Sequence, residues 1–461
     1  MAETLGALVA DPSGTQYILS NTHILGRTDL AQPGEAIIQP GLIDTSTCTP
    51  SGARTVANLT AFYNLENGPA PKIDAAIAQV VPGNVDPQGN ILYLGGSPDA
   101  NGVPIPAGPH QGAGVTAALG MLVGKSGRST GLTCGTVIAV AVNVGSVQYQ
   151  KGCGTGANFS VSYTNQVAFA GRSGGGSFSA EGDSGSLIVS QSTADPVALM
   201  YAGSDTDTVG NPVSAVLNYF ASVGKNVTFV GDTASTGHQV FGCSLPVKPA
   251  SASTTQAAAT VAPDVMQKAA AVRDAHAPEL LAHPEVQAVG VGASRDNPRE
   301  PAILFFVTTG QPRTDIPTQV DGVRTRIVAG PLFPRRGALT TQESAQLEQS
   351  LAAAPEVYPI SEAELARAKQ VHATHAQEQM SQAGVQGVGI SSSLDAPGEA
   401  ALMIFLVRGV THNPIPAVID GLRTRVRESS PFRAGSGDSS RRGTCTLPPS
   451  KTPASKLPAS N

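Results

Sequence analysis

The stretch Glu181-Gly182-Asp183-Ser184-Gly185-Ser186 leads directly into an apolar run, Leu187 to Val189. A serine hydroxyl is a weak nucleophile unless a base takes its proton and hydrogen-bond donors meet the developing oxyanion. Glycines on both sides of the serine allow the backbone N–H groups to turn toward a bound carbonyl and leave space for a substrate. The stretch therefore predicts a nucleophilic Ser184 in a tight turn, served by a base and an acid elsewhere in the chain.

Both partners are found upstream of this turn. His23 follows a strand-like apolar run within residues 17–26, and Asp74 opens a second apolar run within residues 71–80. The order His, Asp, Ser along the chain is that of the chymotrypsin class and differs from the order in subtilisins and α/β-hydrolases. We therefore assign His23 as the general base, Asp74 as the carboxylate that orients it and Ser184 as the nucleophile.

Three further blocks occur in the order that this class uses, namely residues 123–137, 199–204 and 210–217. With them, residues 3–231 resemble a trypsin-like serine protease of the bacterial type. The resemblance implies an all-β double barrel, a chymotrypsin-like fold, and hydrolysis of peptide bonds in a protein or peptide substrate through an acyl-enzyme. It also implies that the N–H groups of Gly182 and Ser184 form the oxyanion hole.

The resemblance places two residues in the substrate pocket, and the chain departs from the family pattern in two ways. It places Phe178 near the base of the pocket and Gly203 in one wall, so an apolar preference is weakly favoured; the alternative is that Phe178 only packs in the barrel. The family usually has glycine where Ser186 stands. No pro-segment precedes the first strand-like residues, so Asp183 is expected to find a partner other than a freed N-terminus.

Each assignment has rivals in the sequence. His110 lies in a loop rich in Pro and Gly, Asp29 lies close to His23 in the chain, and Asp44 lies in a turn. These positions fit the chemistry less well than His23 and Asp74. A catalytically silent binding scaffold with the same fold is the alternative function, and an esterase would share the same three residues.

Composition limits the class of protein. The 461 residues suffice for two or three domains, and a hydrophobic content of 41% supports buried cores. The net charge of −5 is small and no basic stripe occurs, so we expect no nucleic-acid partner. Gly124-Lys125-Ser126 resembles the end of a phosphate-binding loop, but Leu119 stands where that motif needs glycine, so we expect no nucleotide cofactor.

The cysteines indicate neither a metal site nor a disulfide framework. Cys48, Cys134, Cys153, Cys243 and Cys445 are irregularly spaced and form no CxxC pair, so no metal is expected. The separation of Cys134 and Cys153 permits a bond between neighbouring strands but does not require one. We see no signal peptide and no apolar span of about 18 residues, so we expect a cytoplasmic protein with free thiols and no membrane partner.

The second half of the chain is a duplication. After a linker rich in Ala, Ser, Thr and Pro at residues 248–262, the sequence repeats at an offset of 99 residues. Residues 286–291 match 385–390, residues 302–307 match 401–406, and residues 321–327 match 420–426. We expect an α+β domain of two repeats, at residues 263–335 and 336–428, each with one helix and three strands, and we expect the two repeats to pair their sheets.

The duplicated domain has no spacing typical of a nucleophile or a metal site. Arg324, Arg326, Arg423 and Arg425 alternate along matching strands, which predicts an outward, solvated face. His276 and His375 occupy matching helix positions and are expected on the surface. We interpret the domain as an exosite, a regulatory cover or a surface for homo-oligomer formation. The domain at residues 1–247 is the predicted protease, and residues 429–461 are expected to be disordered.

Overall fold

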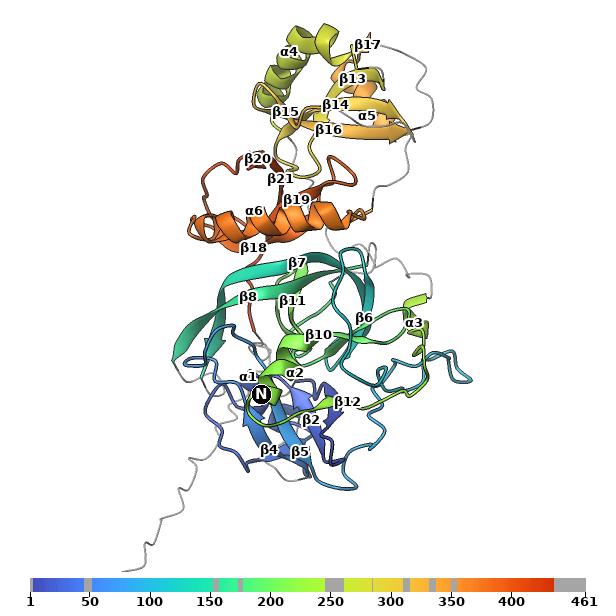
Figure 1. Ribbon diagram of the computed structural model, residues 1–461, viewed down its shortest axis with the longest axis vertical. Helices are drawn as coiled ribbons and strands as arrows, with labels where there is room; N and C mark the ends of the chain where they lie inside the picture. Colours follow the sequence, from blue (N-terminus) through green and yellow to red (C-terminus); the bar gives the residue numbers. More distant parts are fainter. Residues whose placement is uncertain are drawn as a thin grey trace, which may run out of the picture.

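The computed structural model describes residues 3–44, 52–151, 157–172, 177–244, 261–283, 285–309, 316–330, 337–349 and 355–434. The chain forms three sheets stacked along its longest axis, with the N-terminal half at one end (Figure 1). From this half the chain passes first to the far end, where α4 lies, and then returns to the middle, where α6 lies. The expected linker falls almost entirely outside the described residues, as do Cys48, Cys153, Cys445 and residues 435–461.

The first sheet is antiparallel and carries the histidine. Its strands lie in the order β12 (Thr228–Phe229), β1 (Ala7–Ala10), β2 (Gln16–Ser20), β5 (Ala76–Val80), β4 (Arg54–Phe62) and β3 (Ala36–Gln39). Tyr17, Ile18 and Leu19 of β2 are buried, and the chain turns directly after this strand into the short helix α1 (Thr22–Leu25). The end strands β12 and β3 do not pair with each other in the described chain, so this sheet is open.

The second sheet contains a closed ring. Its order is β20 (Val418–Ile419), β21 (Leu422–Ser429), β19 (Ala400–Val407), β18 (Val385–Ser392), β7 (Gly131–Gln150), β6 (Leu122–Gly127), β9 (Leu187–Ser190), β10 (Pro196–Gly203), β11 (Asp207–Pro212) and β8 (Asn158–Gly171). Because β7 also pairs with β8, the six strands from β7 to β8 close on themselves. The N-terminal half is thus β-rich as expected, with one closed ring and one open sheet rather than two closed barrels.

The third sheet belongs to the first repeat. It runs β15 (Gln319–Val320), β16 (Val323–Gly330), β14 (Pro301–Thr308), β13 (Val286–Ala293) and β17 (Gly337–Ala338). β17 pairs with β13, and α5 (Thr341–Gln349) contacts the same strand. Residues 337–349 therefore extend the first repeat rather than opening the second.

The second repeat is joined to the N-terminal half by backbone pairing. β18 pairs antiparallel with β7, with Gly387 opposite Val144 and Val388 opposite Asn143. Phe405 of β19 shares a buried cluster with residues of both N-terminal sheets. The expectation that the two repeats pair their sheets with each other is therefore wrong, because the free edge of β18 is used by β7 instead.

The two repeats meet through a reciprocal set of bonds in which each member has a counterpart 99 residues away. Ser294 and Arg295 donate to the carboxylate of Asp395, and Ser393 and Leu394 donate to that of Asp296. Arg324 donates to the carbonyl and hydroxyl of Thr424, and Arg423 does the same to Thr325. The four arginines expected on a wet face are buried at this contact or beside it, since the polar face of each strand meets protein rather than water.

A disulfide and an ordered segment differ from expectation. Cys134 bonds Cys243 of α3 (Phe241–Ser244), not Cys153, because α3 packs beside β7 although 109 residues separate the two cysteines. Residues 429–434, expected to be disordered, are placed: Phe432 and Ala434 are buried against the N-terminal half. Burying a phenylalanine stabilises by about 2 kcal/mol, which helps to explain why this segment is ordered.

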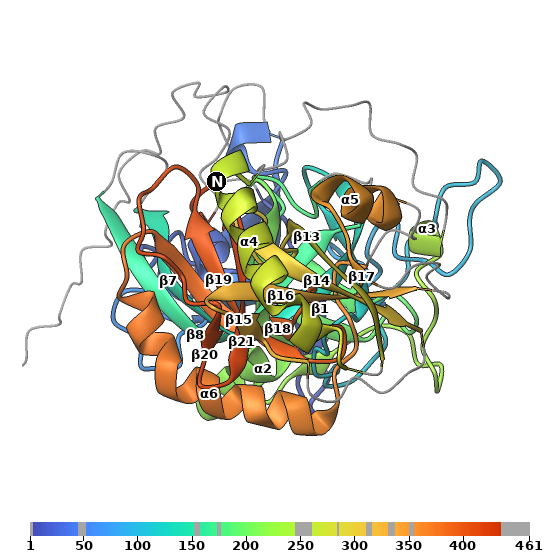
Figure 2. The same cartoon turned by 90° about the horizontal axis from the view of Figure 1, so that it is seen from above.

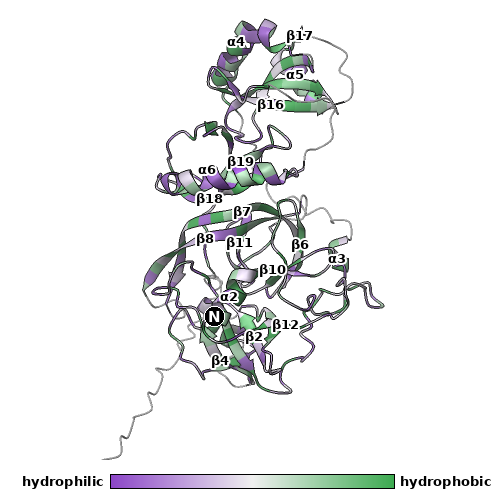
Figure 3. Ribbon diagram, in the orientation of Figure 1, coloured by the Kyte–Doolittle hydropathy of each residue, from purple (hydrophilic) through white to green (hydrophobic). Residues whose placement is uncertain are grey.

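The remaining elements are η1 (Leu42–Asp44), α2 (Val213–Ser222), α4 (Pro263–Leu280) and α6 (Glu362–Met380). Seen from above, α6 runs along the rim of the molecule (Figure 2). Both α4 and α6 carry hydrophilic as well as hydrophobic residues (Figure 3), as expected of helices that cover one side of a sheet. Among the described helices, none combines the length and the apolar character needed to span a membrane.

Candidate active site

His23 and Asp74 form a buried pair at the end of the first sheet. The Nδ1–H of His23 donates to Asp74 Oδ2 at 2.5 Å, and the backbone N–H of His23 donates to Asp74 Oδ1 at 3.1 Å. α1 presents the histidine directly after β2, and Asp74 lies just before β5, which pairs with β2. Two neighbouring strands therefore bring together residues that are 51 positions apart.

Several side chains orient Asp74. Tyr149 of β7 donates its hydroxyl to Asp74 Oδ2 at 2.9 Å, and Asn21 donates to the Asp74 carbonyl at 2.6 Å. The backbone N–H of Asp74 donates to Asn211 Oδ1 at 2.6 Å. Since Tyr149 and Asn211 come from the closed ring, the second sheet holds the acid that the first sheet supplies. The sequence had no pattern that would reveal these two residues.

Ser184 lies in the expected glycine turn. Gly182 and Gly185 have φ values of +94° and +87°, which favour glycine. A Cβ on Gly185 would lie 2.2 Å from Ser20 Oγ and 3.1 Å from Ile24 Cδ1. The serine turn therefore lies against the residues that flank His23, and its glycine is needed for that approach.

Asp183 finds an internal cation. Lys125 Nζ donates to Asp183 Oδ2 at 3.0 Å, and both side chains are buried. Burial alone would raise the pKa of Asp183, but Lys125 and hydrogen bonds from Thr130 and Ala180 outweigh it and lower the pKa. The lysine that had resembled part of a phosphate-binding loop thus stabilises the serine turn, and Asp183 has the partner that was expected in place of a freed N-terminus.

Two residues of the N-terminal segment contact the histidine and the serine. Glu3 accepts a hydrogen bond from His23 Nε2 at 3.1 Å, and Thr4 donates its N–H to the carbonyl of Ser184 at 3.1 Å. Ser184 Oγ donates to the carbonyl of Tyr201 at 3.4 Å. With a carboxylate on each ring nitrogen, His23 carries both protons and is an imidazolium in this arrangement.

The charge balance agrees with that protonation state. Burial would lower the pKa of His23, but the carboxylates of Asp74 and Glu3 outweigh it and raise the pKa to about 10. Sequence reasoning missed Glu3, because one acidic residue near a terminus carries no motif.

The rival residues lie elsewhere. His110 bonds Asp195 at 2.6 Å, Asp29 accepts the N–H groups of Leu65 and Glu66, and Asp44 pairs with Arg128. Among the described residues, none of these three rivals forms a hydrogen bond or ion pair with Ser184. His276 of α4 and His375 of α6 pair with Asp321 and Asp420, which lie in the turns before β16 and β21, as matched surface contacts.

A cavity of about 350 Å³ adjoins the serine turn. Its lining includes Ser179–Glu181 before the turn, Gly203 at the end of β10, Asp205 after that strand, and three residues of the C-terminal segment, residues 430–434. Gly203 thus lies in the wall of this cavity. Phe178 does not line the cavity; it is buried among core residues and stacks on Phe169. The lining combines polar side chains, such as Ser179 and Glu181, with apolar ones, such as Met200 and Pro431.

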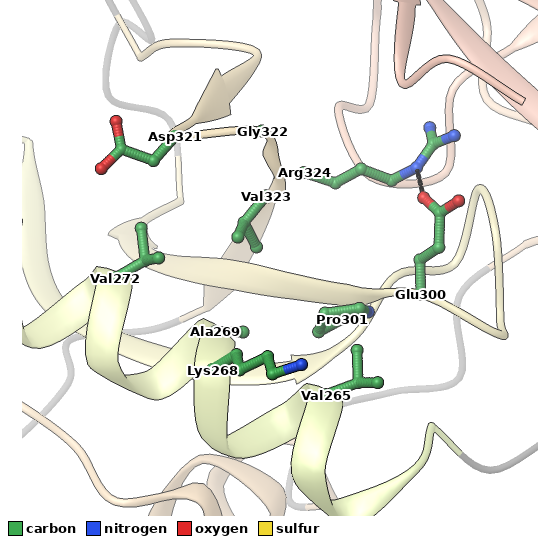
Figure 4. A pocket seen from close by; sticks show the side chains of 10 residues that line it. All are labelled: Val265, Lys268, Ala269, Val272, Glu300, Pro301, Asp321, Gly322, Val323 and Arg324. Atoms are coloured by element: carbon green, nitrogen blue, oxygen red, sulfur yellow. Dashed lines mark hydrogen bonds and ion pairs between the residues drawn. The ribbon is translucent and has the colours of Figure 1, made fainter. Parts of the chain in front are cut away.

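A second cavity, of about 360 Å³, lies in the first repeat between α4 and the start of β16 (Figure 4). Val265 and Lys268 face it from α4, and the Arg324–Glu300 pair lies at its edge. The lining holds no serine, threonine or cysteine. Within the described ranges no group of three or more His, Cys, Asp or Glu side chains is arranged to hold a metal ion.

Comparison with known proteins gives only partial likenesses. No family model matches the chain, and no curated protein does. A solved glutamic acid-specific serine protease is 21% identical and aligns over 49% of this chain and 98% of its own, with a TM-score of 0.31. Thermobifida fusca protease A is 16% identical over 50% of this chain and 91% of its own, with a TM-score of 0.31. Nocardiopsis protease is 17% identical over 49% and 90%, with a TM-score of 0.30. These likenesses do not assign the chain to a family.

Proposed function

We propose that this chain is a serine endopeptidase that acts on protein or peptide substrates through an acyl-enzyme. The observation that carries the proposal is the buried His23–Asp74 pair beside a serine held in a glycine turn. Burial of an oriented histidine and carboxylate next to a hydroxyl is the arrangement that nucleophilic catalysis by serine needs.

In this mechanism Ser184 Oγ attacks the carbonyl carbon of the peptide bond, and His23 Nε2 takes its proton. The carbonyl oxygen becomes an oxyanion, for which the N–H groups of Gly182 and Ser184 are free donors, as no hydrogen bond among the described residues uses them. The tetrahedral intermediate collapses as the C–N bond breaks, and His23 returns the proton to the departing amine. Water then attacks the acyl-enzyme, with His23 again taking a proton.

Asp74 stays ionised throughout and keeps the imidazole in one orientation, while Tyr149 and Asn211 keep Asp74 in place. Before His23 can accept a proton from Ser184, Glu3 has to leave and the proton already on Nε2 has to pass to water. The arrangement with Glu3 in contact is therefore the resting, latent form of the proposed enzyme.

The test compares Ser184→Ala with Ser186→Ala, a change two residues away in the same turn. We expect Ser184→Ala to lower peptide hydrolysis by roughly a million-fold and to abolish labelling by a fluorophosphonate probe. Ser186→Ala should retain both. Hydrolysis that survives in Ser184→Ala at the wild-type rate contradicts the proposal.

A silent binding scaffold is the second candidate, and one observation favours it. His23 Nε2 contacts Glu3, and Ser184 Oγ contacts a backbone carbonyl rather than the imidazole. If the probe fails to label Ser184 both in the wild type and after Glu3→Gln, the scaffold is the better interpretation.

A further inference from the structure

The C-terminal segment, residues 430–434, pairs with the end of β10. The N–H of Gly203 donates to the carbonyl of Arg433 at 3.0 Å, and the N–H of Arg433 donates to the carbonyl of Gly203 at 2.9 Å. Phe432 and Ala434 are buried and Pro431 and Arg433 are exposed, which is the alternation of an added strand. The segment therefore binds β10 in the way that an extended peptide binds a sheet edge.

The same edge of β10 holds the serine turn. Three residues before Gly203, Met200 exchanges backbone hydrogen bonds with Gly185 and Ser186. Between these two points, the carbonyl of Tyr201 accepts the bond from Ser184 Oγ. A peptide that pairs with Gly203 thus lies beside the proposed nucleophile, and the C-terminal segment occupies that place.

The segment also forms part of the cavity. Ser430, Pro431 and Arg433 line it together with Ser179–Glu181 and Gly203–Asp205. A substrate that used both the cavity and the edge of β10 would have to displace these residues.

The second repeat holds the segment in this position. Ser430 exchanges two hydrogen bonds with Asp205, and Arg408 pairs with Asp205 at 2.6 Å. Gln386 of β18 accepts a hydrogen bond from the N–H of Phe432 at 2.8 Å. The pairing of β18 with β7 keeps the second repeat beside the closed ring. The contacts of the repeat and of the segment therefore act together.

We infer that residues 430–434 are an intramolecular ligand of the peptide-binding edge at Gly203, so that the duplicated half restrains the proposed peptidase by occupying its substrate position. The inference rests on the proposed function for the meaning of the edge. The ligand class it assigns to this edge is an extended peptide bound through its main chain. Because the segment is tethered, its effective concentration is in the millimolar range, so a free peptide competes only when the segment is weakened.

The experiment measures binding rather than turnover. The probe is a fluorescent peptide with the sequence of residues 430–434, titrated onto the full chain. Arg433→Pro removes the N–H that donates to Gly203, and Arg433→Ala is the matched control because it keeps that N–H. We expect Arg433→Pro to bind the probe about tenfold more tightly than the wild type, and Arg433→Ala to match the wild type.

A second variant, Gln386→Ala, removes the anchor on β18 and should also tighten probe binding. Thermal unfolding of all variants checks that they are folded. If neither Arg433→Pro nor Gln386→Ala binds the probe better than the wild type, the inference is overturned.

Labelling of Ser184 by a fluorophosphonate, measured on the same samples and in the Glu3→Gln background, separates this result from the proposed function. Tighter probe binding without any labelling supports occupancy of the edge and contradicts the peptidase chemistry. Labelling of Ser184 together with unchanged probe binding contradicts the inference about residues 430–434 but leaves the proposed peptidase function standing.

Discussion

Two clusters of buried charge in this molecule look alike in composition and differ in how completely they are bonded. The cleft cluster comprises Glu3, His23 and Asp74, and the repeat junction comprises Asp296 and Asp395 with the serines and arginines around them. At the junction the bonds to Asp296 and Asp395 and those from Arg324 and Arg423 each have a counterpart 99 residues away. In the cleft, Glu3 Oε1 and the nearby Asn21 Oδ1 and Tyr201 hydroxyl are buried without partners among the described residues.

The difference teaches that buried charge by itself does not mark a catalytic site. Fully reciprocated charges hold two surfaces in one register, and changing them costs stability. Charges that leave donors and acceptors unused next to a nucleophile can exchange partners, and that exchange is what a reaction requires. The comparison predicts that substitutions in the cleft change activity and that substitutions at the junction change stability.

Among the substitutions that compare the two clusters, Asp74→Asn is expected to have the largest effect. Loss of the carboxylate leaves His23 in the wrong tautomer, so kcat should fall by roughly ten-thousand-fold while the unfolding temperature changes little. Peptide hydrolysis by the purified chain measures it. Asp29→Asn is the control, since in the described part of the chain Asp29 accepts only the N–H groups of Leu65 and Glu66. Equal losses in the two variants would contradict the assignment of Asp74.

Glu3→Gln should raise activity. It removes one of the two carboxylates that raise the pKa of His23 to about 10, so the neutral imidazole forms at lower pH. In the wild type, protonated His23 stabilises the latent form, in which Glu3 contacts Nε2. This stabilisation is fully present below about pH 6.5 and is lost as pH rises through about 10. We expect at least about a tenfold gain near neutral pH and a pH–rate midpoint that moves downward. Glu66→Gln, which removes a surface pair with Lys151, should leave the profile unchanged.

At the junction, Asp395→Asn should lower the free energy of unfolding by about 2 kcal/mol, because the donors Ser294 and Arg295 lose a buried carboxylate. Activity should remain near the wild-type level. Asp420→Asn, an exposed partner of His375 in the same repeat, should cost less than about 0.5 kcal/mol. Chemical denaturation measures both. If Asp395→Asn lost most of its activity while its unfolding curve stayed unchanged, the distinction between the two clusters would be wrong.

The smallest effect concerns pH. Burial and the neighbouring Asp395 raise the pKa of Asp296 to about 7. A carboxyl whose pKa is raised on folding stabilises most below its ordinary value of 3.8, and that stability is lost as pH rises through about 7. We expect the melting temperature to fall by a few degrees between about pH 5 and about pH 8, partly through Asp296. His23 acts in the same direction, so the difference between wild type and Asp296→Asn isolates the aspartate. If the difference in melting temperature between the wild type and Asp296→Asn does not change with pH, the raised pKa of Asp296 is contradicted.

Local sequence patterns are the source of the proposed chemistry and predicted many of the elements. The glycine turn at Ser184, the placement of His23 after an apolar strand and the apolar run after Asp74 are features of neighbouring residues, and the structure places each of them as a strand end or turn. The 99-residue offset likewise predicted matching helices and strands, because a repeated pattern of apolar residues specifies the same local structure twice.

Local patterns of this kind did not predict which strand edges and faces would contact each other. Alternation along β16 and β21 correctly separated two faces, yet the face that carries Arg324 and Arg423 meets the other repeat instead of water. Cys134 bonds a cysteine 109 residues away, and Phe178 turns into the core while its neighbours line the cavity.

The sequence by itself thus determined the identity and chain order of the three side chains proposed to react and the existence of a duplication. Only the tertiary structure decided that Glu3 contacts His23, that β18 continues the sheet of β7, and that the C-terminal segment pairs with Gly203. The physical reason is that these contacts are made by backbone groups and single charges. Every residue except proline offers the same N–H and carbonyl, so such pairing leaves no periodic trace in the sequence.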